Sequence, residues 1–497
     1  MLMDGISLKE LLNHLYVKDI HGDIKGLVKG IAYHTDKVED GTLFFALPGT
    51  RAKGWEYAGA AVEKGALAVV TGMEAPILGF PQIRTSDVRQ AISLLASCFY
   101  GNPADEMRLI GVTGTNGKTT ITHLIDTILR ETGLVTGLIG TVSYMVAGEV
   151  TEPLSTTPEA SDLQALFANM REKEVSHAVM EVSSHALELQ RVAGSEFDTA
   201  VLTNITADHL DFHNDFESYR RAKTKLFSQM GGSFLKNNKP RVAIINADDA
   251  SFPYISARTP VQQITYGLKG EADLLAENPV TDLKGISYRL KSFAGNIDIK
   301  LRLRGTFNIY NSLAAIAVGL TEGIDIKDIA AILEEVEGVS GRFEQIDCGQ
   351  DYLVVVDYAH TADGLDNVLQ TARQLLASGK LITVFGCGGD RDRTKRPLMG
   401  EMAGKYSDIC VITSDNPRGE DPEEIVKDII PGLEKKKKRD EYYIEIERGA
   451  AIKKALSLAK KGDIVLIAGK GHEDYQVFKD KTIHFSDQET VRDILSV

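Results

Sequence analysis

Short apolar runs alternate with longer amphipathic segments along nearly the whole chain. Short apolar runs bounded by turn residues predict buried strands, and the amphipathic segments between them predict helices. This alternation is typical of mostly parallel sheets whose strands are joined by helices. We therefore expect an α/β fold.

Two breaks in this pattern divide the chain into three predicted domains, residues 1–105, 106–338 and 339–497. The first break is a Gly-Asn-Pro turn and a charged link that precede a new strand. Three domains also suit the length of 497 residues, which is too long for a single core.

The domains differ in their predicted strands. The first has buried strands within 41–49 and 66–72, with a helical segment over 55–64 between them. The second has strands within 108–114, 177–184, 199–205 and 241–248, and an alternating patch over 286–305 that predicts an antiparallel hairpin or meander. In the third, four apolar runs lead into polar or glycine-rich loops, within 352–360, 381–390, 408–417 and 463–473. Such loops form one edge of a doubly wound sheet, where ligands bind.

Composition excludes several classes of protein. The chain is 43% hydrophobic and 25% charged, as in soluble globular proteins. No apolar run approaches the roughly 18 residues of a membrane helix, and the first residues lack an export signal. The four cysteines form no CxxC pair and indicate reduced thiols: Cys98, Cys348, Cys387 and Cys410. We expect a cytoplasmic protein, by default a monomer.

The net charge of −14 argues against a nucleic-acid binder, since phosphate contacts need a basic surface. Local clusters of arginine and backbone N–H groups can still bind small anions. The one basic block, 435–439, is interpreted as a solvated helix end or loop; the alternative is a patch for nucleic acid or membrane.

The strongest local signal is the segment GVTGTNGKTT, 111–120. Glycines let backbone N–H groups surround phosphate oxygens, Lys118 adds a positive charge, and Thr119 offers a hydroxyl to Mg²⁺. The flanking strand and helix patterns fit this interpretation. One position departs from the strict phosphate-loop motif, because Val112 stands where the first glycine belongs. The alternative is a glycine-rich turn with a chance lysine.

Two other glycine clusters follow predicted strands. The first, 386–391, fails the dinucleotide motif because Arg391 holds its last position. The second, 468–473, lacks the Ser or Thr of a phosphate loop. Their places at strand ends favour binding over simple turns.

ATP chemistry also needs magnesium ligands beyond the loop. Glu181 ends one predicted strand and His209 follows another, so both are expected at the edge where Thr119 lies. Taken alone, the segment around His209 is more often a hydrogen-bonded loop than a metal site. The default interpretation of Lys223 is a surface lysine on a helix.

Together these segments resemble the ATP-dependent Mur ligases, and among them the members that add the third amino acid to UDP-N-acetylmuramoyl-L-alanyl-D-glutamate. The resemblance spans nearly the whole chain and rests on TGTNGKTT, STTPE, MEVSSHAL, TNITADHLDFH, RAKTKLF, FNIYNSLAA, GRFEQI, DYAHTADGL, GCGGDRDRTKRPLM and AGKGHE. The family's own loop, T-G-T-N-G-K-[ST], accounts for Val112.

The resemblance implies an N-terminal domain for the UDP end of the substrate, a central ATP domain and a C-terminal Rossmann-like domain for the amino acid. It implies ATP contacts from Gly114, Thr115, Asn116, Gly117, Lys118, Thr119, Thr120, Asn308, Arg342 and Asp357. It further implies Mg²⁺ held by Thr119, Glu181, His209 and a carbamylated Lys223, and catalytic roles for Lys118, His209 and Lys223.

For the UDP-linked substrate, the resemblance implies contacts from Thr35, Thr50, Arg51, Ala52, Thr156, Thr157, Ser183 and Arg191. The N-terminal domain departs most from the family. Thr35 and Asp36 stand where the family has serine and arginine, and Lys53-Gly54 replaces an acidic residue and glycine. Ala362 replaces a proline of the family in the third domain.

Asp-Asn-Pro-Arg, 415–418, directly follows a predicted strand. In the family this pattern occurs in members that add meso-diaminopimelate, and the matching pocket residues here are Arg391, Asp415, Asn416, Pro417, Arg418, Gly469 and Glu473. An arginine can bind the distal carboxylate bidentately, and Glu473 is the expected partner of the distal ammonium. The alternative is a turn and helix cap, with Arg418 paired to Glu420 or Asp421.

The expected reaction forms an acyl phosphate from ATP and the D-glutamate γ-carboxylate, which an incoming amine then attacks. L-Lysine as third substrate, a folylpolyglutamate-type ligase and a P-loop NTPase remain the competing interpretations.

Overall fold

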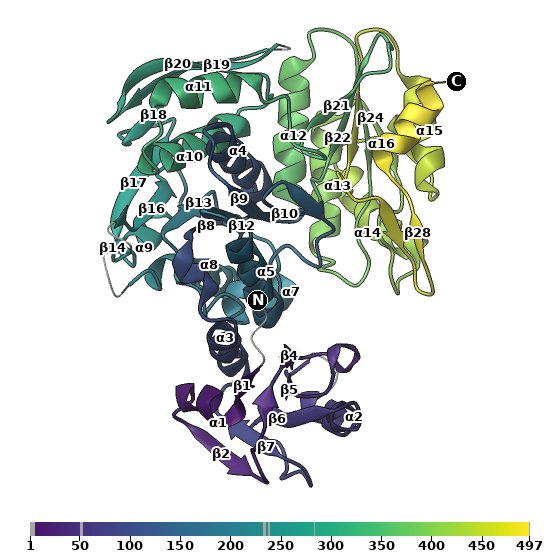
Figure 1. Ribbon diagram of the computed structural model, residues 1–497. Helices are drawn as coiled ribbons and strands as arrows, with labels where there is room; N and C mark the ends of the chain where they lie inside the picture. Colours follow the sequence, from purple (N-terminus) through teal and green to yellow (C-terminus); the bar gives the residue numbers. More distant parts are fainter. Residues whose placement is uncertain (1–4, 50–52, 232–234, 237–238, 283, 497) are drawn as a thin grey trace. The chain divides into compact units, whose positions relative to one another are not determined.

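The computed structural model describes residues 5–49, 53–231, 235–236, 239–282 and 284–496. The chain forms two compact units, which are described separately. The first comprises Met1–Thr113, Gly133–Ala200 and Ala222–Arg241, and the second Gly114–Thr132, Val201–Arg221 and Val242–Val497. Both are α/β in architecture (Figure 1), as the sequence predicts.

The first unit begins with a five-stranded sheet in the order β2-β7-β6-β5-β4. Its strands are parallel except for β2, which runs antiparallel to β7. The predicted helix after residue 54 forms as a 3₁₀ turn and α2, and α3 packs on the apolar core. The bounds are β2 Lys18–His21, β4 Gly30–Ala32, β5 Thr42–Phe45, α2 Ala58–Glu63, β6 Ala66–Gly72, β7 Gln82–Thr85 and α3 Val88–Phe99.

A second run of strands in this unit has the order β11-β10-β9-β12-β8. β12 is parallel to both β8 and β9, while β10 is antiparallel to its neighbours. Glu181 therefore lies at the carboxyl end of a central parallel strand, as predicted. The bounds are β8 Arg108–Thr113, β9 Thr136–Ile139, β10 Tyr144–Val146, β11 Glu149–Thr151, α5 Ala160–Glu172, β12 His177–Glu181 and α6 Ser184–Glu188.

The second unit contains the run β16-β17-β18-β19-β20. β18, β19 and β20 are antiparallel, which confirms the predicted meander. The bounds are α4 Lys118–Glu131, α7 Leu210–His213, β16 Val242–Asn246, β17 Gln262–Gly267, β18 Leu274–Asp282, β19 Gly285–Ser292, β20 Gly295–Leu301, α10 Phe307–Thr321 and α11 Ile326–Glu335.

A six-stranded sheet in the same unit has the order β21-β22-β26-β23-β24-β25 and is parallel apart from β21. Helices α12, α13 and α14 cover one face, and α15 and α16 cover the other (Figure 1). The bounds are β21 Glu344–Ile346, β22 Leu353–Asp357, α12 Ala362–Leu375, β23 Leu381–Phe385, α13 Lys395–Tyr406, β24 Ile409–Ile412, α14 Pro422–Leu433, β25 Tyr442–Ile444, α15 Arg448–Leu458, β26 Ile464–Ala468 and α16 Asp487–Leu495.

This sheet is doubly wound, and the four predicted apolar runs are its adjacent strands β22, β26, β23 and β24. Their carboxyl ends meet at one edge, so the loops that follow them converge there. The basic block 435–439 follows α14 and is largely exposed, in agreement with a solvated segment. Among the described residues, no helix is long and apolar enough to cross a membrane.

A buried ion pair fixes α15 and α16 against this sheet. The Arg448 guanidinium bonds both carboxylate oxygens of Asp487 at 2.7 Å, and both side chains are fully buried. Removing the carboxylate leaves an arginine charge without its partner in a low-dielectric interior. We expect Asp487→Ala to lower the free energy of unfolding by about 3–5 kcal/mol, measured by denaturant titration. Asp493→Ala, an exposed position on the same helix, is the matched control and should change little; equal effects from both would contradict this account.

Candidate functional site

The predicted phosphate loop lies between β8 and α4, where strand, glycine-rich turn and helix follow one another as expected. Val112 is fully buried inside β8, so a glycine is not needed there. The turn itself requires glycine at Gly114 and Gly117, whose φ angles are 149° and 88°. A Cβ at these positions would meet Thr203 Oγ1 at 1.8 Å and Asn311 Oδ1 at 2.6 Å.

Side chains hold this loop in shape. Lys118 Nζ donates to the carbonyl oxygens of Gly114 and Thr115, both at 2.9 Å. The Asn116 amide donates to Asp363 at 2.7 Å, and the Thr115 hydroxyl donates to the Thr206 carbonyl at 3.0 Å. The first turn of α4 supplies N–H groups that no helical carbonyl accepts. The loop therefore has the ordered form of an anion site at a helix N-terminus, and its binding of ATP stays a prediction.

Arg342 links this loop to the six-stranded sheet. Its guanidinium donates to Thr119 Oγ1 at 2.8 Å and lies 4.5 Å from the centre of the Tyr358 ring. Asp357 accepts hydrogen bonds from the backbone N–H groups of Phe343 and Ala359, both at 2.7 Å. Burial raises the pKa of Asp357, against the nearby charge of Arg342. The carboxylate thus fixes the segment that carries Arg342.

The remaining predicted ATP contact, Asn308, lies in the first turn of α10. It accepts a hydrogen bond from Asn311 at 2.8 Å and donates to the Arg304 carbonyl at 2.7 Å. Asn311 is also the residue that closely approaches Gly117. Asn308 is thereby connected to the loop, although its role toward ATP stays a prediction.

Four of the residues predicted for the UDP-linked substrate come together around Glu181. Thr157 Oγ1 donates to the Glu181 carbonyl at 2.9 Å, Arg191 donates to the Thr157 carbonyl at 2.9 Å, and Ser183 caps α6. Thr141 bonds both the Glu181 carboxylate and the Thr156 hydroxyl.

The other predicted contacts for this substrate lie in the N-terminal segment. Thr35 begins a 3₁₀ turn, and its carbonyl accepts from Lys64. Thr50, Arg51 and Ala52 lie outside the described residues.

Lys223 departs most clearly from what its local sequence pattern indicated. The default interpretation of Lys223 as a surface lysine is wrong, because only 2% of the residue is exposed. The isolated α8 pattern, Phe216–Ser228, does not reveal this, since burial depends on what packs against the helix. Among the described residues, no three His, Cys, Asp or Glu side chains are grouped to hold a metal ion. The predicted magnesium set also needs a threonine and a modified lysine, and it stays a prediction.

A cavity of about 220 Å³ opens at the carboxyl edge of the six-stranded sheet, within the second unit. Six of the seven residues predicted for the amino-acid pocket line it: Arg391, Asp415, Asn416, Arg418, Gly469 and Glu473. Pro417 is buried in the same loop and does not line the cavity. The sequence pattern did not predict the other residues that line the cavity: Asp208, Asp211, Tyr358, His360, Gly388, Asp392 and Lys395. His209 also lines it, although the sequence predicted His209 only as a magnesium ligand and catalytic residue.

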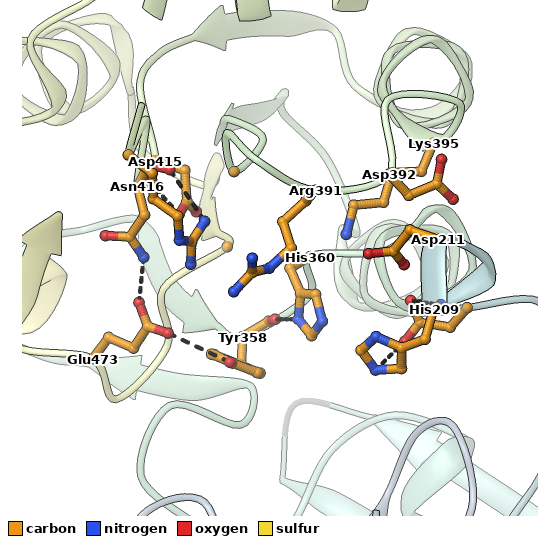
Figure 2. A pocket seen from close by; sticks show the side chains of 14 residues that line it. His209, Asp211, Tyr358, His360, Arg391, Asp392, Lys395, Asp415, Asn416 and Glu473 are labelled. Atoms are coloured by element: carbon orange, nitrogen blue, oxygen red, sulfur yellow. Dashed lines mark hydrogen bonds and ion pairs between the residues drawn. The ribbon is translucent and has the colours of Figure 1, made fainter. Parts of the chain in front are cut away.

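Figure 2 shows how the cavity is arranged. Carboxylate and amide side chains line one side of the cavity, and a second set of charged side chains lines the opposite side. Three further side chains lie between these two sets. The first side holds Asp415, Asn416 and Glu473, the second His209, Asp211, Asp392 and Lys395, and the middle Tyr358, His360 and Arg391.

Arg418 does not adopt the alternative ion pair with Glu420 or Asp421. Its guanidinium donates to the carbonyl oxygens of Gly389 at 3.0 Å and Asn416 at 3.3 Å. Burial and the neighbouring Arg391 lower its pKa. Two positive groups are thus held near each other, an arrangement that an anionic ligand would stabilise.

Glu420 is instead bound by the buried Arg396. Arg396 also contacts Asp428 at 2.8 Å and the Gly388 carbonyl at 3.2 Å. Glu420 in turn accepts from the Asp390 N–H at 2.6 Å. This network positions the loop that carries Arg391.

Glu473 is fixed by three donors. Asn416 Nδ2 and Lys470 Nζ approach its Oε2 at 2.9 and 3.0 Å, and the Tyr358 hydroxyl lies 3.4 Å from Oε1. Oε2 is therefore occupied, whereas Oε1, with one long contact, has capacity for a ligand ammonium. Lys470 is fully buried and was not predicted.

Asp415, the first residue of the motif, is 7% exposed. Although burial opposes ionisation, the positive charges of Arg448 and Lys470 hold the pKa of Asp415 below its usual range. The cavity thus presents anionic and cationic groups on neighbouring loops.

These features define a class: an α/β protein with a phosphate-binding loop and a charged pocket at the carboxyl edge of a doubly wound sheet. Models of the Mur ligase middle domain and of the Mur ligase glutamate ligase domain match residues 112–319 and 341–471. A UDP-N-acetylmuramoyl-L-alanyl-D-glutamate–2,6-diaminopimelate ligase of Syntrophomonas wolfei is 47% identical, with 99% of each chain covered. The chain belongs to the Mur ligase family.

Solved structures agree with this assignment. The structure of a UDP-N-acetylmuramoyl-L-alanyl-D-glutamate–2,6-diaminopimelate ligase is 34% identical, covers 99% of both chains and has a TM-score of 0.68. A MurF structure from Acinetobacter baumannii covers 100% of both chains with a TM-score of 0.67 at 16% identity, which shows a shared fold alone.

Proposed function

We propose that this chain is an ATP-dependent ligase that joins meso-diaminopimelate to UDP-N-acetylmuramoyl-L-alanyl-D-glutamate, a step in peptidoglycan precursor synthesis. The relatives that carry this activity in their names support the proposal over nearly the full length of the chain. The observation that carries it is the charge arrangement of the cavity at the carboxyl edge of the six-stranded sheet.

The cavity suits the distal end of diaminopimelate, which carries both a carboxylate and an ammonium. Arg418 offers a guanidinium fork for the carboxylate, and Glu473 Oε1 offers an acceptor for the ammonium. L-Lysine has no distal carboxylate and would leave the guanidinium without an anionic partner. A partly buried cation without its partner disfavours that substrate.

The phosphate loop would bind ATP so that the substrate's γ-carboxylate attacks the γ-phosphate, with ADP leaving. Lys118 and the N–H groups of α4 would stabilise charge on the transferred phosphoryl group. The incoming amine then attacks the acyl phosphate, and phosphate leaves as the amide forms. Exclusion of water at this stage protects the acyl phosphate from hydrolysis.

Magnesium is part of the proposal, since it would neutralise charge on the phosphates. The donors fit in kind: Thr119 contributes a hydroxyl, Glu181 a carboxylate that is 1% exposed, and His209 an imidazole. Lys223 is buried, which suits an inward-facing magnesium ligand. Carbamylation of its amine would turn the side chain into such a ligand. We also propose that the protein acts as a monomer in the cytoplasm, where ATP is supplied.

The test is phosphate release from ATP by the purified protein with the UDP-linked dipeptide, comparing meso-diaminopimelate with L-lysine. We expect release that depends on the dipeptide and is stimulated by meso-diaminopimelate alone. Stimulation mainly by L-lysine would contradict the role given to Arg418. Release that needs no amino acid would favour a simple NTPase.

A further inference from the structure

The same cavity contains a histidine to which nothing above gives a role. His360 follows β22 in the loop after Asp357, and it lines the cavity beside Tyr358 (Figure 2). If the distal zwitterion occupies the side formed by Asn416, Arg418 and Glu473, the reacting amine must lie away from them. His360 lies in the middle of the cavity, between its two sides (Figure 2), and Asp208 also lines the cavity.

The contacts of His360 fix its orientation. Its Nδ1 lies 3.0 Å from the carbonyl oxygen of Tyr358, which can only accept a hydrogen bond. Nδ1 therefore carries the proton, and in the neutral ring Nε2 is an acceptor. The Tyr358 ring packs against the imidazole with ring centres 4.7 Å apart. Among the described residues, no hydrogen bond to Nε2 is found.

The location of His360 also connects it to the phosphate loop. Tyr358, whose carbonyl holds His360, stacks on Arg342, and Arg342 donates to Thr119 at the start of α4. His360 thus lies between the amino-acid clamp and the element expected to hold the phosphates.

His360 is neutral near pH 7. Burial lowers its pKa to about 4; Lys395 and, more weakly, Arg342 act in the same direction, and Asp208 opposes them. The other titratable or charged groups that line the cavity are His209, Asp211, Tyr358, Arg391, Asp392, Asp415, Arg418 and Glu473. A neutral imidazole can accept a hydrogen bond from an amine, which an imidazolium cannot.

We propose that His360 Nε2 accepts a hydrogen bond from the reacting amine of the amino-acid substrate and takes its proton during amide formation. This inference rests on the proposed ligase function. The amine nitrogen, having released one proton to solvent, forms a bond to the acyl carbon. The resulting N–H⁺ passes a proton to Nε2. The C–O bond to phosphate then breaks with its electron pair leaving on phosphate, and His360 returns the proton to solvent.

A substitute nucleophile separates this step from the earlier chemistry. Hydroxylamine is a much weaker base than an amino-acid amine and is largely unprotonated at neutral pH, so its attack on the acyl phosphate has less need of a proton acceptor. The experiment measures phosphate release and hydroxamate formation with the UDP-linked dipeptide, using either meso-diaminopimelate or hydroxylamine. The variants are His360→Asn and His360→Gln, with His484→Ala, an exposed histidine at the end of the strand Thr482–His484, as control.

We expect both His360 variants to lose about 10²-fold or more in kcat with meso-diaminopimelate, the usual contribution of a general base, while hydroxamate formation stays at the wild-type rate. Equal losses with both nucleophiles, or no loss with either, would overturn the role of His360. Failure of the wild-type protein to release phosphate with the dipeptide and meso-diaminopimelate would instead remove the proposed ligase function, and this inference with it.

Discussion

Replacing Arg418 by alanine should lower kcat/KM for meso-diaminopimelate about 30- to 4,000-fold, which corresponds to a loss of about 2–5 kcal/mol in transition-state stabilisation. The guanidinium is half-buried, its pKa is lowered by burial and by Arg391, and carbonyl oxygens are its hydrogen-bond acceptors. A substrate carboxylate would supply the missing negative charge. Removing the guanidinium leaves that carboxylate in the cavity without its bidentate partner.

The measurement is steady-state phosphate release at varied amino-acid concentration, with meso-diaminopimelate and L-lysine compared. The loss in kcat/KM should affect meso-diaminopimelate and not L-lysine. The preference of the enzyme for meso-diaminopimelate over L-lysine should therefore narrow or reverse. Arg418→Lys should lie between wild type and alanine, because an ammonium keeps the charge but not the fork. Arg393→Ala is the matched control: this arginine lies near the same loop, is 63% exposed and pairs with Asp428. An equal loss for both amino acids would argue that Arg418 only shapes the loop.

The sequence was sufficient for the sheet that builds this pocket. Strands β22, β23, β24 and β26 are mostly apolar runs, and in a parallel sheet the polar residues that end or follow them meet at one edge. The pattern indicated that these loops meet at one edge, and the resemblance to the Mur ligases assigned Arg391, Arg418 and Glu473 to one pocket, whose cavity they line.

Other parts of the site depend on contacts that a local pattern does not carry. Lys470 and Arg448 are fully buried cations whose partners, Glu473 and Asp487, are set by tertiary packing. A lysine between two glycines reads locally as a turn residue. His360 lies in the segment DYAHTADGL, but its proposed role depends on its hydrogen bond to the Tyr358 carbonyl and on its place in the cavity.

The domain boundaries and the nucleotide contacts remain predictions for a different reason. The nucleotide contacts concern how residues approach a bound substrate, which the fold of the chain alone does not define. For Lys223, the default sequence interpretation was wrong about exposure, because burial depends on what packs against α8, which the helix's own pattern does not carry.

Replacing Lys118 by methionine should lower kcat for ATP cleavage by about 10²–10³-fold, the loss typical for one group that stabilises transition-state charge. Lys118 Nζ bridges the carbonyl oxygens of Gly114 and Thr115 at 2.9 Å, so its charge is held at the loop before ATP binds. Methionine keeps most of the side-chain volume and removes the charge. Charge on the β- and γ-phosphates would then be left without this cation.

Initial rates of ADP formation at saturating ATP, dipeptide and diaminopimelate measure the effect on kcat directly. Because the two carbonyl bonds also stabilise the loop, thermal unfolding of each variant must accompany the kinetics. Arg130→Ala, at the far end of α4 and half-exposed, should leave both quantities unchanged. If Lys118→Met cleaves ATP at the wild-type rate, the lysine serves only to close the loop. The N–H groups of α4 and the proposed magnesium would then have to stabilise the transition-state charge.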